Sequence, residues 1–219
     1  DEFVETALSL DNIDLCGVHF HIGSQITETG PFVLLCRKVG EILDRMKALG
    51  AEITIVDMGG GFGIDYDDPD GNPIPDFEHY FAVFRDNLQL SPDQELHFEP
   101  GRSIVGQCGS LITRVLYVKE GTVKKFAIVD AGMTDLIRPA LYQAHHKIEN
   151  ISSTSAVDDV YDVVGPICES SDSFGTDERL PLVQRGDFLA LRSAGAYGEI
   201  MASTYNCRRL PGCVFSTDL

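Results

Sequence analysis

The segment best suited to chemistry is a run of glycines, Asp57-Met-Gly-Gly-Gly-Phe-Gly63, which follows a short β-branched stretch at residues 53–56. Glycine adopts positive φ freely and has no Cβ, so the N–H groups of such a turn can wrap an anion. A phosphate is the ligand that suits this turn best. The segment has no Gly-Lys-Ser/Thr of a P-loop, and its spacing differs from the dinucleotide-binding G-x-G-x-x-G. A flexible turn without a ligand is the structural alternative.

Two further groups of side chains carry chemistry in the first half of the chain. His19 and His21 have the H-x-H spacing that can bind zinc at a strand end, and a histidine ring can also stack on a flat cofactor. Glu99 could hold a ring nitrogen protonated, and Arg102 beside it could bind a phosphate or carboxylate through two hydrogen bonds. An ion pair within the loop is the structural alternative for Glu99 and Arg102.

The second half of the chain offers three more candidates. Arg138 and Tyr142 pair a cation with a phenol, and Cys168 lies in a Gly-Pro turn next to an acid, a placement that allows a reactive role. Tyr197 lies in a glycine-bounded turn. By default, Cys168 is a small buried apolar residue and Tyr197 a buried ring with a satisfied hydroxyl.

The hydrophobic pattern predicts the elements that position these residues. It indicates strands at 15–22, 53–57 and 95–99, a helix that begins near Pro31 and ends near Gly50, and a second helix at 77–88. This order is typical of a parallel α/β arrangement, in which ligands bind at the carboxyl ends of the strands. Because His21 to Ser24, the three glycines and Glu99 to Arg102 all follow such ends, we expect them to converge on one rim.

The pattern changes near residue 103. Strands are indicated at 110–118, 125–130, 161–165 and 188–191, with short helical stretches at 134–143 and 195–202. We therefore expect an α/β plus β protein, with one domain at 1–102 and a mostly antiparallel β-barrel or sandwich domain at 103–219. An acidic loop, Asp65 to Gly71, fails as a calcium site because Phe77 stands where a bidentate glutamate is needed.

Charge, hydrophobicity and cysteine spacing limit the classes of partner and the compartment. The formal net charge is −17, which argues against nucleic acid and anionic membranes as partners. No apolar run approaches the roughly 18 residues of a membrane span. The six cysteines contain no C-x-x-C pair and are typical of reduced thiols, so we expect a cytoplasmic protein.

Taken together, six motifs resemble the pyridoxal-phosphate decarboxylases of the alanine-racemase-like fold type, which have a TIM-like (β/α)8 barrel followed by a β domain. The motifs, in family order along nearly the whole chain, are Gly17-Val-His-Phe-His-Ile-Gly-Ser-Gln25, Asp57-Met-Gly-Gly-Gly-Phe-Gly63, Glu99-Pro-Gly-Arg102, Arg138-Pro-Ala-Leu-Tyr142, Gly165-Pro-Ile-Cys-Glu169 and Gly195-Ala-Tyr197. The resemblance implies a carboxy-lyase that uses pyridoxal 5′-phosphate. In the branch that matches best, the reaction converts meso-diaminopimelate to L-lysine in lysine biosynthesis.

The resemblance also implies a cofactor site. His21 would stack on the pyridoxal ring, and Glu99 would keep the pyridine nitrogen protonated. Arg102 and Tyr197 would lie close to the cofactor. The phosphate would be held by four residues: Ser24, Gly59, Gly60 and Gly61.

The same resemblance implies a substrate site. Arg102, Arg138 and Tyr142 would bind the distal carboxylate of the substrate, with Tyr197 nearby. Glu169 would bind the distal ammonium group. Cys168 would return a proton to the carbon that loses CO2, so that His21, Glu99 and Cys168 form the catalytic set. Cys168 would act in the site of the neighbouring subunit, because the family forms homodimers with shared sites.

One feature departs from the family. The family binds its cofactor through a lysine in a Tyr-Ala-x-Lys-Ala-like motif, and none of the six lysines lies in such a motif. We therefore expect the chain to be the C-terminal portion of an enzyme, preceded by the first five barrel strands, short of the last β-domain strand and inactive by itself.

Three alternatives stay open. One is a metal-dependent barrel hydrolase that uses His19 and His21. The second is a non-catalytic homologue that only binds the cofactor or a partner. The third is a sister decarboxylase that acts on arginine, ornithine or carboxynorspermidine.

Overall fold

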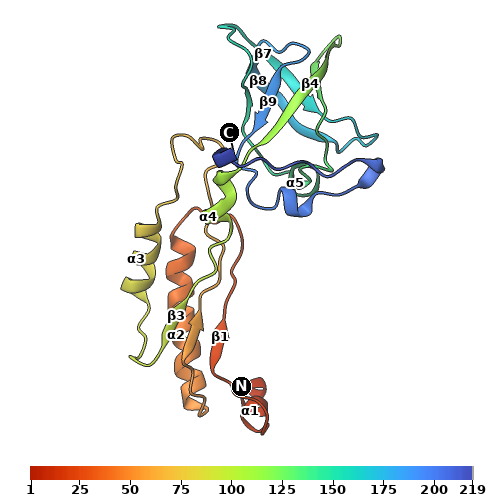
Figure 1. Ribbon diagram of the computed structural model, residues 1–219. Helices are drawn as coiled ribbons and strands as arrows, with labels where there is room; N and C mark the ends of the chain where they lie inside the picture. Colours follow the sequence, from red (N-terminus) through yellow and green to blue (C-terminus); the bar gives the residue numbers. More distant parts are fainter. Residues whose placement is uncertain (219) are drawn as a thin grey trace. The chain divides into compact units, whose positions relative to one another are not determined.

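The computed structural model describes residues 1–218, which group into two compact units (Figure 1). Unit 1 comprises Asp1–Ile64 and Ile74–Ser103. Unit 2 comprises Asp65–Pro73 and the chain from Ile104 onward. The acidic loop therefore groups with unit 2, although it connects two elements of unit 1. No helix in the described part of the chain is long and apolar enough to cross a membrane.

Unit 1 is built on a three-stranded parallel sheet in the order β1-β2-β3. The strands are β1 (Gly17–His19), β2 (Ile55–Asp57) and β3 (Glu95–His97), with Gly17 opposite Ile55 and Ile55 opposite Glu95. The strand–helix–strand–helix–strand order predicted from the sequence is confirmed, with shorter strands. The described residues contain this part of a parallel α/β sheet and no closed TIM-like barrel.

Helices α2 (Gly30–Ala48) and α3 (Phe77–Asn87) lie side by side and cover one face of this sheet (Figure 1). The buried residues of α2 recur every three or four positions, as one face of a helix requires: Phe32, Leu35, Cys36, Val39, Leu43 and Met46. Pro31 fits the first turn of α2, and the Asp76 side chain caps α3 by accepting a hydrogen bond from the His79 N–H at 2.9 Å. A further short helix, α1 (Glu2–Leu8), precedes β1.

Side-chain alternation along the strands sorts two kinds of residue. Val56 and Met58 are buried against the helices, together with the partly buried Val18, Leu96 and Phe98. The residues between them point to the opposite face of the sheet. That face therefore carries the charged and ionisable side chains at the strand ends: His19, Asp57, His97 and Glu99.

Unit 2 is built on a six-stranded mixed sheet in the order β6-β9-β4-β5-β7-β8. The strands are β4 (Leu111–Glu120), β5 (Lys125–Val129), β6 (Ile148–Asn150), β7 (Asp158–Val164), β8 (Ser173–Pro181) and β9 (Phe188–Leu191). Only β5 and β7 pair in parallel among these strands. The outer strands β6 and β8 also contact each other, so the sheet curls into a nearly closed barrel around its own apolar core.

The sequence pattern missed β6 and β8 and gave helices that are too long. Residues 134–143 contain only α5 (Arg138–Tyr142), and residues 195–202 contain one 3-10 turn, Glu199–Met201. Short helical segments also occur at α4 (Arg102–Val105) and in 3-10 turns at Gly106–Cys108, Tyr205–Cys207 and Ser216–Asp218.

The acidic loop Asp65–Pro73 is tied into unit 2 by its own carboxylates. Asp65 accepts hydrogen bonds from the N–H groups of Asp67 and Asp68, which lower its pKa. Asp70 binds the guanidinium of Arg192 through both carboxylate oxygens, at 2.6 and 3.2 Å, and this contact lowers the pKa of Asp70. Arg192 also binds Glu149 at 2.6 Å. The carboxylates of this loop thus stabilise the loop itself and hold it to Arg192.

Candidate active site

The three segments that follow the strands of unit 1 meet at one edge of the sheet. Phe20 donates its N–H to the carbonyl of Asp57, and Glu99 donates its N–H to the carbonyl of Gly59, both at 2.9 Å. Ile26 donates its N–H to the carbonyl of Gly61 at 2.9 Å. The structure therefore brings the glycine run beside both neighbouring strand ends, as parallel strands of matched register require.

Each glycine of the run lies against the backbone of a neighbouring segment. A Cβ on Gly59 would overlap the carbonyl oxygen of Phe20, and one on Gly60 would lie 2.5 Å from that of Glu99. A Cβ on Gly61 would lie 2.6 Å from the carbonyl oxygen of Gly23. Gly59 and Gly61 also have positive φ, +69° and +101°. Three glycines are therefore needed here for packing as well as for conformation.

The N–H groups of this turn fit an anion. The Gly59 N–H already donates to the Asp57 carboxylate at 2.8 Å. The N–H groups of Gly60 and Gly61 have no hydrogen-bond acceptor among the described residues, although Gly60 is buried. Buried donors without an acceptor are rare in folded proteins and mark a place where a ligand oxygen fits. On this observation the residues present suit a phosphate group.

Ser24 and Arg102 form a second polar contact in unit 1. Arg102 donates from Nη2 to the Ser24 hydroxyl at 3.0 Å. A guanidinium bound to this hydroxyl places a positive charge beside it, which favours an anion there. Two residues predicted for phosphate and cofactor binding therefore lie together.

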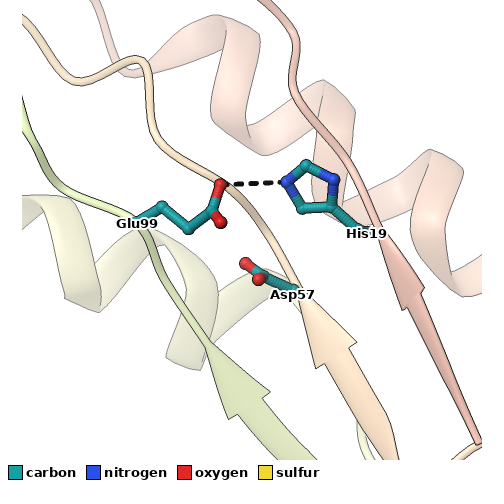
Figure 2. A group of neighbouring side chains, drawn as sticks. All are labelled: His19, Asp57 and Glu99. Carbon is teal, nitrogen blue, oxygen red and sulfur yellow. Dashed lines mark hydrogen bonds and ion pairs between the residues drawn. The ribbon is translucent and has the colours of Figure 1, made fainter.

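Glu99 has neighbours that the motifs did not indicate. Its Oε2 lies 3.0 Å from Nε2 of His19, and Asp57 lies next to both (Figure 2). One ligand atom from each of the three residues falls within 4.8 Å of the others. His19 and Glu99 are each about half exposed, at 53% and 56%. The β1–β2 register pairs His19 with Asp57, so the strand alignment was the signal that could have predicted this cluster.

His21 lies two residues beyond the end of β1 and is exposed. It is therefore His19, and not His21, that the structure places beside Glu99. The predicted stacking of His21 on a ring stays a prediction.

In unit 2, Arg138 is the most deeply placed candidate. The residue is 6% exposed, and its guanidinium lies 4.9 Å from the centre of the Tyr66 ring. Its Nη1 lies 2.7 Å from Nε2 of His146, a residue that is fully buried. Tyr142, one helical turn further along α5, is exposed. Neither Tyr66 nor His146 was indicated by the sequence, since both contacts depend on tertiary folding.

Cys168 and Glu169 lie on an exposed turn after β7. Asp172 holds this turn by accepting the N–H groups of Ile167 and Met133, each at 2.6 Å. Burial raises the pKa of Asp172, and these hydrogen bonds oppose the rise. The turn requires glycine at position 165, where a Cβ would overlap the Asp172 carboxylate.

Two tyrosines of unit 2 complete the description of the predicted site residues. The Tyr205 hydroxyl donates to Oε1 of Glu169 at 2.7 Å, and this bond raises the pKa of Tyr205. Tyr197 is partly exposed and has φ of +58°, in the left-handed region that non-glycine residues rarely adopt. Such backbone strain is often found at functional sites.

Comparison with known proteins agrees with this arrangement. Residues 13–195 match a family model described as pyridoxal-dependent decarboxylase, C-terminal sheet domain. The chain is 58% identical to a diaminopimelate decarboxylase of Bacteroides thetaiotaomicron, over all of this chain and 56% of that protein. It is 46% identical to one of Archaeoglobus fulgidus, over 97% of this chain and 51% of that protein.

Solved structures give the same relationship. A mutant diaminopimelate decarboxylase of Helicobacter pylori in complex with L-lysine has a TM-score of 0.85 at 42% identity, over 94% of this chain and 50% of that one. A lysine/ornithine decarboxylase of Vibrio vulnificus in complex with putrescine has a TM-score of 0.86 at 23% identity, over 100% and 59% of the two chains, and shares the fold. The chain thus spans about half the length of the relatives it matches. By this match over most of its length, the chain belongs to the pyridoxal-dependent decarboxylase family.

Proposed function

We propose that the full-length protein decarboxylates meso-diaminopimelate to L-lysine with pyridoxal 5′-phosphate. The observation that carries the proposal is the pair of buried or partly buried glycine amides, at positions 60 and 61, that have no acceptor among the described residues. They lie against the segments that carry Glu99 and Ser24, since a Cβ on Gly60 would meet the Glu99 carbonyl oxygen and one on Gly61 that of Gly23. The names of the relatives supply the substrate, since they are diaminopimelate decarboxylases.

In this proposal, unit 1 of the chain holds the cofactor. The amides of Gly60 and Gly61 and the Ser24 hydroxyl would bind the phosphate, and Arg102 would add positive charge beside Ser24. Glu99 would keep a proton on the pyridine nitrogen. His19, 3.0 Å from Glu99, would orient that carboxylate, and His21 would lie on the face of the ring. When bound, the cofactor supplies an electron sink for the pair released as CO2 leaves.

Unit 2 would hold the far end of the substrate and move a proton. Arg138 and Tyr142 would bind the distal carboxylate, and Glu169 would bind the distal ammonium group. Cys168 would give its Sγ proton to the carbon that loses CO2, in the site of a partner subunit. Arg102 and Tyr197 would complete the site in the roles that the family resemblance implies.

The chain by itself is proposed to be inactive, because none of its six lysines lies in the cofactor-binding motif of the family. We also propose that the protein is a homodimer of the cytoplasm. All six cysteines are free thiols in the structure, which agrees with a reducing compartment.

The proposal is tested by supplying the purified full-length protein with pyridoxal phosphate and measuring CO2 release. We expect turnover of meso-diaminopimelate, with much lower kcat/KM for lysine, ornithine and arginine. Preference for ornithine, arginine or carboxynorspermidine would instead support the sister decarboxylases. Cofactor binding without release of CO2 from any of these would support a non-catalytic homologue.

A second candidate function rests on the cluster of His19, Asp57 and Glu99. Imidazole and carboxylate ligands suit zinc, and a catalytic zinc site needs three protein ligands. The cluster therefore fits a metal-dependent hydrolase better than the H-x-H spacing of His19 and His21 did. The Asp57 carboxylate already accepts the Gly59 N–H, however, and two of the three side chains are about half exposed. Metal analysis of the purified protein separates the two: stoichiometric zinc that is essential for activity would favour the hydrolase.

A further inference from the structure

His146 is placed unlike any other ionisable residue discussed above, because it is fully buried and contacts a cation. Its Nε2 lies 2.7 Å from Nη1 of Arg138. A guanidinium has only donor groups and remains charged in proteins. The Nε2 atom must therefore be the acceptor, and it carries a lone pair and no hydrogen.

The second ring nitrogen completes the assignment. Nδ1 of His146 lies 2.8 Å from the carbonyl oxygen of Arg192, which can only accept. Nδ1 therefore carries the hydrogen. The two contacts together fix His146 as a neutral imidazole in the Nδ1–H tautomer, since each nitrogen is committed by its partner.

The Tyr66 ring restricts both residues further. It meets the His146 ring edge to face, with centres 5.1 Å apart, and the Arg138 guanidinium lies 4.9 Å from its centre. A cation over an aromatic face is attracted to it. Arg138 is thus held by a hydrogen bond at one nitrogen and by a ring, in a site where it is 6% exposed.

A neutral acceptor has a particular effect on an arginine. A carboxylate in the position of His146 would orient the guanidinium and also cancel its charge. A neutral imidazole orients the guanidinium and leaves its charge intact for another anion. The hydrogen bond with His146 fixes the position of one nitrogen of the planar guanidinium and so sets the direction of its fork.

We infer that His146 is a positioning residue, which orients Arg138 toward the distal carboxylate of the substrate. This inference rests on the proposed function, in which Arg138 binds that carboxylate. His146 touches neither substrate nor cofactor in this role. It acts through Arg138, and the Arg192 carbonyl acts through His146 by fixing its tautomer.

Two substitutions in the full-length protein each keep one of the two hydrogen bonds. In His146→Gln, the side-chain amide reaches the position of Nε2, so its oxygen can still accept from Arg138. In His146→Asn, the shorter amide reaches only the position of Nδ1 and can still donate to the Arg192 carbonyl. His145→Gln is the matched control, because the neighbouring His145 is exposed and pairs with Asp67 at 3.3 Å.

We expect His146→Asn to raise the KM for meso-diaminopimelate by about 10- to 100-fold, the usual worth of a hydrogen bond to a charged group. Its kcat should change much less, since binding at the distal end is lost uniformly. His146→Gln should keep the KM close to that of the wild type, and His145→Gln should match the wild type. Nitrogen-15 NMR of the full-length protein should show His146 as the neutral Nδ1–H tautomer.

The outcomes separate the inference from the proposed function. If the wild type fails to decarboxylate meso-diaminopimelate, the proposed function fails, and the ligand of Arg138 fails with it. If the wild type is active and His146→Asn, folded by thermal melting, keeps a normal KM, the inference alone fails. Equal loss in the Gln and Asn variants, or an Nε2–H tautomer, would overturn the inference as well.

Discussion

At the scale of single residues, Arg138 is a charged side chain in a buried position. At 6% exposure its charge has lost most of its hydration, and this cost must be offset by polar or charged partners. In the full-length protein, Arg138→Ala removes the proposed partner of the distal carboxylate. We expect kcat/KM for meso-diaminopimelate to fall by about one to three orders of magnitude. The ratio of kcat/KM for meso-diaminopimelate to that for lysine should fall, because lysine has no distal carboxylate.

Steady-state kinetics with both substrates measures this effect, and Arg85→Ala is the control. Arg85 is exposed and pairs with its neighbour in the chain, Asp86, at 3.2 Å. Its loss should change neither stability nor turnover appreciably. Unchanged turnover of meso-diaminopimelate by Arg138→Ala would show that the substrate assignment is wrong.

Site residues differ in how far the sequence can predict them. The glycine run and Glu99 follow strands, so the rule for parallel sheets places them on one edge without any structure. His19 beside Glu99 needed the register of β1 and β2 as well, and a shift of one residue would have turned it to the other face. His146 contacts Arg138, and Tyr205 contacts Glu169, only because the folded chain brings them together. No local sequence pattern predicts such contacts.

At the scale of elements, the glycine turn can be tested by adding a single methyl group. In Gly60→Ala, the new Cβ would lie 2.5 Å from the Glu99 carbonyl oxygen, which is backbone and cannot move aside cheaply. We expect a large loss of pyridoxal phosphate affinity, measured by titration of the apoprotein, together with a lower melting temperature.

Gly40→Ala is the matched control for Gly60→Ala. Gly40 lies inside α2, and a Cβ there would meet nothing within 4 Å. Alanine in a helix interior should stabilise the protein by about 0.5–1 kcal/mol, because it loses less backbone entropy on folding than glycine. Cofactor affinity should stay unchanged in this variant. Normal cofactor binding by Gly60→Ala would contradict the assignment of the turn.

The elements themselves were predictable where the pattern was long and regular. The helix α2 has 19 residues and six buried side chains at helical spacing, so its period stands out. Strand β6 has only three residues, and β8 includes Asp177, Glu178 and Arg179. Such a short or charged strand is stabilised by its neighbours in the sheet, which the local sequence does not report.

At the scale of the whole molecule, the proposed dimer predicts a specific result for mixed subunits. Glu99→Gln and Cys168→Ala subunits should each be inactive as homodimers. In heterodimers isolated with two affinity tags, one of the two sites would receive an intact Glu99 and an intact Cys168. If sites are shared, we expect about half of the wild-type activity per dimer.

Heterodimers of Glu99→Gln with Gly60→Ala are the control, because both substitutions lie in unit 1 and disable both sites. Activity of these heterodimers should stay at the background level. No recovery in the Glu99→Gln and Cys168→Ala pair would show that Cys168 does not serve a partner's site.

The grouping of Asp65–Pro73 with unit 2 has a consequence for how such proteins can recombine. The chain passes between the units three times, after residues 64, 73 and 103. A gene segment that begins at Ile104 would leave behind the Tyr66 ring beside Arg138 and the Asp70 carboxylate bound to Arg192. Exchange of the β unit between relatives must therefore carry two separate stretches of sequence. The nine residues of the loop and the sheet they bind are expected to be inherited together.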